Sequence, residues 1–272
     1  SDFLSFKVQI FPSKANLHRY EAYLLEKGCM CNTVSTYMRR IRCVYNKAIE
    51  DGDAEYIPGL FQGVFTGVES KRKKSLSLEN QHKLMTVKVE SEVLRETQLV
   101  VCLLFQYAGM SFVDFAHLKE RNIKNGILDY NRQKTGTPMR LEILDTAELM
   151  RKELMGDKKP ASGYLFPFLS GTKTGYEAYL EYNAALSRFN RNLKALKKAA
   201  GIASDVTSYT IRHSFAMALK EQNVPIEMIS ELLGHKSIKT TQIYLRSFSL
   251  EKMTEVNSTC FGCVYNYVSK VG

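Results

Sequence analysis

The chain has 272 residues, 44% of them hydrophobic and 24% charged, so it is long enough for two globular domains that each bury a core. Lysine and arginine exceed aspartate and glutamate by 38 − 28 = 10, which is typical of a polyanionic partner, nucleic acid before acidic membrane, and equally of a merely basic protein. No run of 18 apolar residues occurs, and the first ten residues lack a secretory pattern, so we expect a cytoplasmic protein.

Two amphipathic helices open the chain. The first is predicted between Ser13 and Gly28, and the second from Asn32 or Thr33 to just before Gly52. Their apolar positions recur at helical spacing: Leu17, Tyr20 and Leu24 in the first, and Val34, Met38, Ile41, Val44 or Tyr45, and Ala48 in the second. Each helix is therefore expected to bury one face in the core of a first domain.

Two groups of basic residues accompany these helices. The second helix carries Arg39, Arg40, Arg42 and Lys47 opposite its apolar stripe, and Lys71, Arg72, Lys73 and Lys74 lie among Gly and Ser residues. A basic helix face is usually only solvated, but in a protein that binds DNA elsewhere it can follow the phosphate backbone. We interpret residues 71–77 as a basic linker between a helical DNA-binding domain (1–70) and a second domain (78–272).

The second domain is predicted to be mainly helical around one small antiparallel sheet, so the chain as a whole is mainly α (α+β). A helix starts at Ser77, and a long apolar helix over 93–108 ends at Gly109. Short strands over 127–130 and 139–143 flank the turn KTGTP. Further helices are expected from Asp145 or Thr146 to 155 and over 184–200, 208–222 and 226–233, with an aromatic connection over 164–169.

The six cysteines are spread along the chain, and without an export signal their default is the reduced state of a cytosol. Cys260 and Cys263 form a single CxxC with no second pair and no histidine close by. Metal or redox use is one interpretation, and packing as small apolar residues is the favoured one. We therefore expect neither a metal site nor a cofactor.

The segment from Ser208 to Arg246 carries four groups of residues in a fixed order. They are Arg212-His213-Ser214-Phe215, Leu233-Gly234-His235, Thr240-Thr241 and Tyr244, with nine residues from His235 to Tyr244. Residue types, order and spacing together resemble the last catalytic boxes of tyrosine recombinases, the phage-integrase family. A lone LGH or a lone RHS would indicate little.

The resemblance extends upstream over most of the chain. The opening helices and the linker are similar to the family's helical core-binding domain, which leads into its catalytic domain. The turn QKTG is similar to the family's hairpin and makes Lys134 the candidate catalytic lysine. The segment YAGMSFVDFAHLK lies where the family has its first catalytic arginine and, three residues later, an acidic residue; Asp114 fills the acidic place.

Two positions depart from the family pattern. Ser111 stands where the first arginine is expected and cannot offer a guanidinium to a phosphate. Tyr209, three residues before Arg212, replaces the usual histidine. These features resemble the branch found in Bacteroidetes mobile elements, whose GMSFVD-like box also lacks that arginine. An inactive enzyme is the competing explanation.

The chemistry of the four matching residues follows from phosphodiester cleavage. The phosphate is attacked in line, so catalysis is largely positioning and charge stabilisation. The planar guanidinium of Arg212 can form bidentate hydrogen bonds to non-bridging oxygens. Tyr244 would be the nucleophile that forms a 3′-phosphotyrosine. The resemblance implies that Lys134 protonates the leaving 5′-oxygen, while His235 would bind a non-bridging oxygen. Taken singly, each residue could be structural; their joint spacing favours catalysis.

Three further residues are expected to support the site. His213 is predicted to pack behind Arg212, and Tyr209 either to donate a hydrogen bond near the phosphate or to support the site. Asp114 is predicted to orient a catalytic cation. The cations that could replace the missing arginine are Arg95, Arg121, Arg132 and Arg140. Arg132 is favoured because it lies two residues before Lys134, and alternate residues of a strand point to one face.

The resemblance implies a site-specific recombinase that integrates, excises or inverts a mobile element. Its expected partners are double-stranded DNA, further copies of the chain in a tetramer on DNA, and accessory DNA-bending factors. It would act in the bacterial cytoplasm on the nucleoid. Apolar positions in 250–271 indicate packing on an adjacent protomer or on the same chain. The alternatives are DNA relaxation of the type IB topoisomerase kind and a DNA-binding accessory factor with a weakened catalytic domain.

Overall fold

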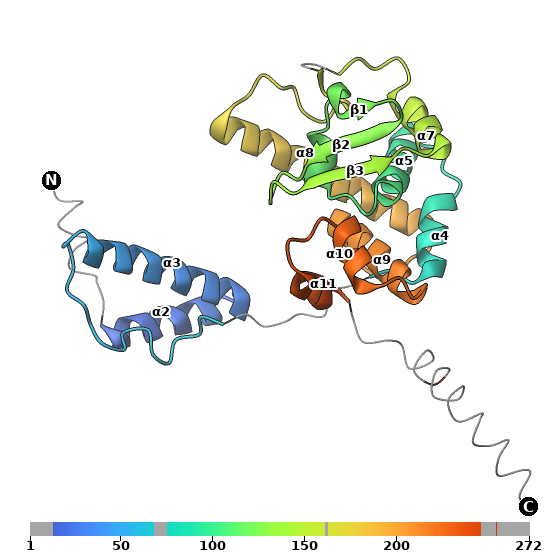
Figure 1. Cartoon of the computed structure of the whole chain (residues 1–272). Coiled ribbons are helices and arrows are strands. Elements are labelled where there is room, and N and C mark those ends of the chain that lie inside the picture. Colours follow the sequence, from blue (N-terminus) through green and yellow to red (C-terminus); the bar gives the residue numbers. More distant parts are fainter. Residues whose placement is uncertain (1–12, 68–74, 161–162, 246–253, 255–272) are drawn as a thin grey trace, which may run out of the picture. The chain divides into compact units, whose positions relative to one another are not determined.

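The computed structural model describes residues 13–67, 75–160 and 163–245, together with Thr254 (Figure 1). The chain divides into two compact units, Ser1–Lys71 and Arg72–Gly272. The basic residues 71–74, the cysteine pair near the C-terminus and the rest of the apolar C-terminal segment lie outside the described residues. Among the helices that are described, none is both long and apolar enough to cross a membrane.

The first unit is built on two helices, α2 (Lys14–Glu26) and α3 (Cys31–Glu50), close to the predicted bounds. The Ser13 side chain caps α2 by accepting a hydrogen bond from the Asn16 N–H at 3.2 Å. The buried core of this unit consists of Leu17, Leu24, Val34, Met38, Tyr45, Leu60 and Val64. Two apolar residues of the predicted stripes, Tyr20 and Val44, are instead exposed.

Tyr45 rather than Val44 enters this core because its hydroxyl finds partners there. The hydroxyl donates to the Glu55 carbonyl at 2.9 Å and accepts from the Ile57 N–H at 2.6 Å. These bonds tie α3 to the loop that follows it. A buried tyrosine usually needs such a partner for its polar end.

The second unit is mainly helical with a small sheet (Figure 1). Its elements are α4 (Leu78–Thr86), α5 (Glu92–Gln106), α6 (Phe112–Ala116), the 3-10 helix η1 (Glu120–Asn122), β1 (Ile123–Lys124), β2 (Ile127–Asn131), β3 (Pro138–Glu142), α7 (Asp145–Met155), α8 (Gly175–Ala199), α9 (Ser208–Glu221), α10 (Ile226–Leu232) and α11 (Ile238–Tyr244). The sheet order is β1-β2-β3, with both pairs antiparallel. The predicted fold class is confirmed.

The core of this unit surrounds the apolar helix α5, which packs against α7, α8 and α9. Aromatic rings fill the space between α6, α8 and the connection after α7. The Phe115 and Phe166 rings stack at 4.1 Å, and the Phe112 and Phe189 rings stack at 4.6 Å. Leu76, at the end of the predicted linker, is also buried here, and its N–H donates to the Ser214 hydroxyl at 2.9 Å.

Several features of this unit differ from the predictions. The sheet has a third strand, β1, whose two residues are too few to show an alternating pattern. Helix α8 begins at Gly175 rather than at 184. Its first turns were not predicted because they expose Tyr176, Tyr179 and Leu180 and so lack a continuous apolar stripe. The short helices α6 and α11 were not predicted, since five and seven residues give little periodicity.

The aromatic core gives a first testable prediction. Phe166→Ala is expected to lower the free energy of unfolding by about 3–5 kcal/mol, because it removes a fully buried ring stacked on Phe115 and leaves a cavity. Urea unfolding followed by circular dichroism measures this loss. Leu149→Ala, at an exposed position of α7, is the control and should change stability little. Equal effects of the two substitutions would contradict this description of the core.

A second prediction concerns the buried thiol of α5. Burial raises the pKa of Cys102 to about 11, so its thiol stays protonated at neutral pH and becomes reactive only as the pH approaches that value. Iodoacetamide at pH 8 should therefore label Cys102 at least about 100-fold more slowly than a free thiol of ordinary pKa. Peptide mass spectrometry measures labelling, with the exposed Cys43 as the internal reference. Equally fast labelling of the two would contradict the prediction.

Candidate active site

Helix α9 positions Arg212 in the interior of the second unit. Thr207 caps this helix, and its side chain accepts from the Thr210 N–H. Arg212 is only 3% exposed; its Nη1 donates to the Gly109 carbonyl at 2.8 Å, and its Nη2 donates to the Leu233 carbonyl. Two backbone segments far apart in the sequence therefore fix the plane of the guanidinium.

A tight turn after α10 carries His235. Gly234 has a φ of +60°, and a Cβ at this position would collide with the Met139 sulfur and lie 2.7 Å from Arg132 Cδ. The Leu-Gly-His motif thus needs glycine for its conformation and for the close packing. The His235 N–H donates to the Ser230 carbonyl at 2.9 Å.

A buried cluster forms around Asp114, which is 2% exposed. Its Oδ2 accepts from the Ser111 hydroxyl at 2.6 Å and lies 3.4 Å from Arg132 Nε. Its Oδ1 accepts from the Gln133 N–H at 2.8 Å. Arg132 is 9% exposed, and its Nη1 donates to the Gly234 carbonyl at 3.0 Å. Asp114 therefore orients Arg132, whereas Ser111 serves as the N-cap of α6.

These residues meet at a pocket of about 500 Å³. Its walls are formed by Ser111, Phe112, Val113, Arg132, Lys134, Thr135, Tyr182, Leu186, Ser208, Tyr209, Arg212, His235 and Thr240. Arg132, Lys134, Arg212 and His235, which come from three separate motifs, thus share one cavity. The walls are cationic and lie in a partly buried setting, which suits an anionic group such as a phosphate.

Lys134 lies in the turn between β2 and β3 and not in a strand. Arg132 follows the end of β2, its N–H donates to the Thr137 carbonyl at 2.9 Å, and its carbonyl accepts from the Gly136 N–H at 2.8 Å. The strand-alternation argument for Arg132 and Lys134 was therefore wrong. Both residues nevertheless line the same pocket, Lys134 as an exposed residue of the turn and Arg132 as a buried residue at its base.

The other candidates for the missing arginine lie away from this pocket. Arg95 forms a bidentate ion pair with Glu153, with N–O distances of 2.6 and 2.9 Å. Arg121 and Arg140 are exposed, and neither lines the pocket.

The remaining predicted residues are placed as follows. His213 is 2% exposed, and its ring meets the Tyr209 ring edge to face at 4.5 Å. Tyr209 itself is half exposed and lines the pocket. The backbone of Tyr244 ends α11, and its side chain lies outside the described residues. Within the described ranges, no group of three or more His, Cys, Asp and Glu residues is arranged to hold a metal ion.

Sequence reasoning assigned no role to two residues that contact this site. Tyr182 of α8 lines the pocket, and burial, followed by the nearby charge of Asp114, raises the pKa of its hydroxyl. No local pattern pointed to it, because the start of α8 was not predicted. Thr241 of α11 is fully buried, and its hydroxyl lies 2.9 Å from His235 Nδ1. The signal for Thr241 was present, since it belongs to the Thr-Thr motif.

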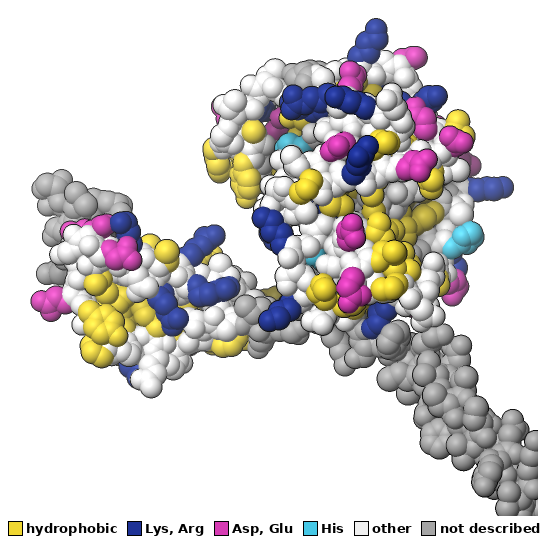
Figure 2. Space-filling view, in the orientation of Figure 1, with side chains coloured by type: hydrophobic (Ala, Val, Ile, Leu, Met, Phe, Trp, Pro, Cys, Tyr) yellow, Lys and Arg dark blue, Asp and Glu magenta, His cyan; other side chains and the backbone are white. Residues whose placement is uncertain are grey.

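The predicted DNA-contacting face of α3 is only partly free. Figure 2 shows several Lys and Arg side chains on the visible face of the first unit. Arg39 and Arg40 are exposed, and Lys47 pairs with Asp51 at 2.9 Å. The Arg42 guanidinium lies 4.9 Å from the Phe61 ring centroid, so part of its role is to pack within the unit.

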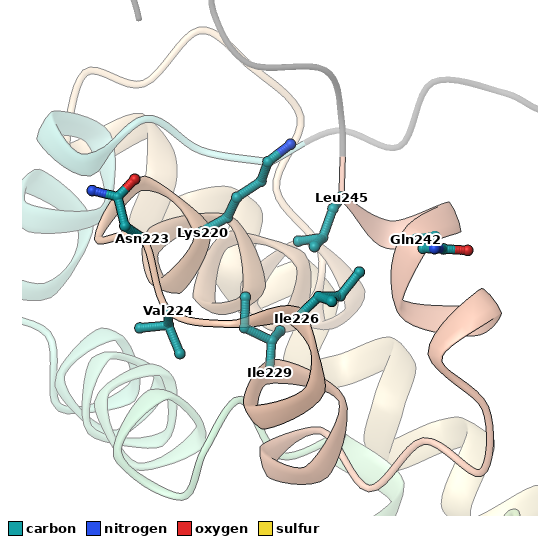
Figure 3. Close-up of a pocket in the computed structure, with 7 residues that line it drawn as sticks. All are labelled: Lys220, Asn223, Val224, Ile226, Ile229, Gln242 and Leu245. Carbon is teal, nitrogen blue, oxygen red and sulfur yellow. The ribbon is translucent and has the colours of Figure 1, made fainter. Parts of the chain in front are cut away.

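A second pocket, of about 460 Å³, lies among α9, α10 and α11 (Figure 3). It is lined by Lys220, Asn223, Val224, Ile226, Ile229, Gln242 and Leu245, none of which was predicted to act in catalysis. Thr240 lines the first pocket, whereas Gln242 and Leu245 line the second. Helix α11 therefore contributes to both cavities.

Comparison with known proteins agrees with this fold. The model of the phage integrase family matches residues 74–251, and that of the phage integrase SAM-like domain matches residues 13–58. A mainly helical catalytic unit with this cationic pocket is thus an integrase-type domain, and the chain belongs to the phage integrase family.

Individual relatives cover most of the chain. It is 27% identical over 239 residues to "Tyrosine recombinase XerA" of Pyrococcus furiosus, which covers 86% of this chain and 77% of the relative. Among solved structures, the Tn1549 transposon integrase in complex with a circular intermediate DNA matches with a TM-score of 0.68 and 14% identity, over 90% of this chain and 85% of that one. A lambda integrase tetramer bound to a Holliday junction matches with a TM-score of 0.64 and 18% identity, over 86% of this chain and 64% of that one.

Proposed function

We propose that this chain is a site-specific recombinase that cleaves and rejoins double-stranded DNA through a 3′-phosphotyrosine at Tyr244. The observation that carries this proposal is the pocket that gathers Arg132, Lys134, Arg212 and His235 beside the helix that ends in Tyr244. Four basic side chains around one cavity match the needs of a phosphodiester whose non-bridging oxygens gain charge in the transition state.

In the proposed reaction, the Tyr244 hydroxyl loses its proton to solvent as its oxygen attacks phosphorus, and the bond from phosphorus to the 5′-oxygen breaks. Lys134, at the hairpin turn, gives a proton to the leaving 5′-oxygen. The tyrosyl phosphate ester conserves the energy of the broken bond, so a 5′-hydroxyl of another strand can reverse the step and rejoin DNA without ATP or a metal ion.

Arg212, Arg132 and His235 would bind the phosphate. The two carbonyls that hold Arg212 set its orientation before DNA arrives, which avoids reorganisation during the reaction. We propose that Arg132 supplies the charge that the family's first arginine would supply at position 111. The support for this is that Asp114 and the Gly234 carbonyl hold Arg132 at the pocket wall.

Covalent capture tests this function without knowledge of the target site. The chain is incubated with a pool of nicked duplexes of random sequence, and protein-bound DNA is isolated under denaturing conditions and sequenced. Enrichment of one sequence in a covalent adduct supports the recombinase. A gel shift without adduct would instead indicate an accessory DNA-binding factor, and relaxation of supercoiled plasmid without sequence preference would indicate a topoisomerase.

The biological setting is part of the same proposal. We propose that the chain belongs to the Bacteroidetes mobile-element branch, which Ser111 in place of the family arginine supports; integration, excision or inversion would be its task. The DNA substrate implies that it acts on the nucleoid, and strand exchange requires two DNA sites, which four copies of the chain would hold. Basic residues 71–74 and those of α3 would contact phosphates, and accessory DNA-bending factors would shape the sites.

A further inference from the structure

Thr241 connects the candidate phosphate-binding histidine to the helix that carries the candidate nucleophile. Its side chain is fully buried, and its hydroxyl lies 2.9 Å from Nδ1 of His235. Thr241 precedes Tyr244 by three residues in α11, whereas His235 belongs to the turn after α10. The hydrogen bond therefore joins two elements that each bring one part of the proposed chemistry.

The two ends of His235 are held by different helices. Its backbone N–H donates to the Ser230 carbonyl of α10 at 2.9 Å, which fixes the residue in the turn. The imidazole is fixed by Thr241 of α11. The partner at one ring nitrogen sets which nitrogen of a neutral imidazole carries the proton and how the ring is turned. The direction of the ring thus depends on the position of α11.

We propose that Thr241 is a positioning residue that aims His235 at the scissile phosphate only while α11 is docked on α10. In this inference, which rests on the proposed function, the Thr241 hydroxyl donates to Nδ1 and leaves the ring proton on Nε2, where it can donate to a non-bridging oxygen. Displacement of α11 then has two simultaneous effects: it removes the nucleophile and it misaligns the His235 imidazole. A protomer in which α11 is not docked therefore does not activate the phosphate.

The packing of α11 supports this coupling. Leu245, the C-cap of α11, packs against the buried cluster of Ala216, Ile229 and Leu233 and lines the second pocket (Figure 3). Leu233 directly precedes the glycine of the His235 turn, and its carbonyl accepts from Arg212. The same apolar contact thus holds α11 against α9, which carries Arg212, and against α10, which leads into the turn of His235.

A double-mutant cycle tests the positioning role. Thr241→Val keeps the shape of the buried side chain but removes the hydroxyl, and we expect cleavage of a nicked substrate to slow by about tenfold, as when a histidine loses the partner that orients it. Thr241→Ser should restore the rate. In the His235→Ala background, Thr241→Val should cost nothing further. An equal loss with or without His235 would overturn the inference.

Thr97→Val is the matched control. Thr97 is also a buried threonine, its hydroxyl donates to the Val93 carbonyl at 2.8 Å, and it lies in α5 away from the candidate site. It should leave the rate unchanged. If Thr241→Val prevents folding, Thr241→Ala replaces it in the same cycle.

Histidine-selective ¹⁵N NMR spectroscopy gives a readout that does not depend on activity. The chain has five histidines, and His235→Ala identifies the resonances of His235. Thr241→Val should shift its Nδ1 resonance, and Leu245→Ala, which loosens α11, should shift it in the same direction. If neither substitution changes the Nδ1 chemical shift of His235, the proposed coupling is overturned. Absence of any covalent adduct with the unchanged chain would instead refute the proposed function. The NMR result does not depend on DNA cleavage, so it tests the contact between Thr241 and His235 separately.

Discussion

Tyr244→Phe is expected to bind DNA as the unchanged chain does and to form no covalent adduct. The substitution removes only the oxygen that becomes the phosphate ester, so the phosphate-binding side chains remain in place. Loss of a nucleophile from an assembled site can cost about 10⁶-fold in rate. The measurement is denaturing gel electrophoresis of the captured substrate, with a gel shift under native conditions to confirm binding.

Tyr182→Phe is the matched control for this result. Tyr182 is a phenol that lines the candidate pocket, but burial raises the pKa of its hydroxyl, which makes it a poor nucleophile near neutral pH. This variant should still form the adduct. An adduct that survives Tyr244→Phe and disappears with Tyr182→Phe would move the nucleophile to α8 and refute the assignment.

Arg132→Ala is expected to slow cleavage by roughly 10²–10³-fold, the loss that follows removal of one preorganised charge-stabilising donor. Arg132 is the buried cation that Asp114 holds at the pocket wall, and position 111 provides none. Cleavage of a nicked substrate under single-turnover conditions measures the effect. Arg140→Ala, at an exposed position of β3 outside the pocket, should cleave at the unchanged rate.

Combination with Ser111→Arg separates the catalytic role of Arg132 from a structural one. Without Arg132, Asp114 is left as a buried carboxylate that has lost its cation, so stability will also fall. In the unchanged chain, Ser111 contacts Asp114. An arginine introduced at this position should therefore recover part of the cleavage rate. Recovery of stability without recovery of cleavage would show that Arg132 serves the fold alone. Unchanged cleavage by Arg132→Ala would refute the assignment of this role to Arg132.

Local signals in the sequence determined much of the helical framework. Ser13, Ser77 and Thr207 accept hydrogen bonds from backbone N–H groups of the next turn, so they set the starts of α2, α4 and α9 wherever these helices pack. The motif residues Arg212 and His235 could be proposed from the sequence, because residue types, order and spacing together resemble the catalytic boxes of a known family. Lys134 could be proposed because its glycine-containing turn is similar to the hairpin of that family.

Only the tertiary structure decided which other side chains lie beside those residues. Arg132 lies at the pocket because Asp114 and the Gly234 carbonyl hold it there, and the strand pattern that pointed to it does not exist. Thr241 acquires its partner through the packing of α11 on α10. Each of these contacts joins segments distant in sequence or separated by a turn. Local propensity and periodicity describe a residue's own helix or strand, so they carry no information about which side chain from elsewhere will face it.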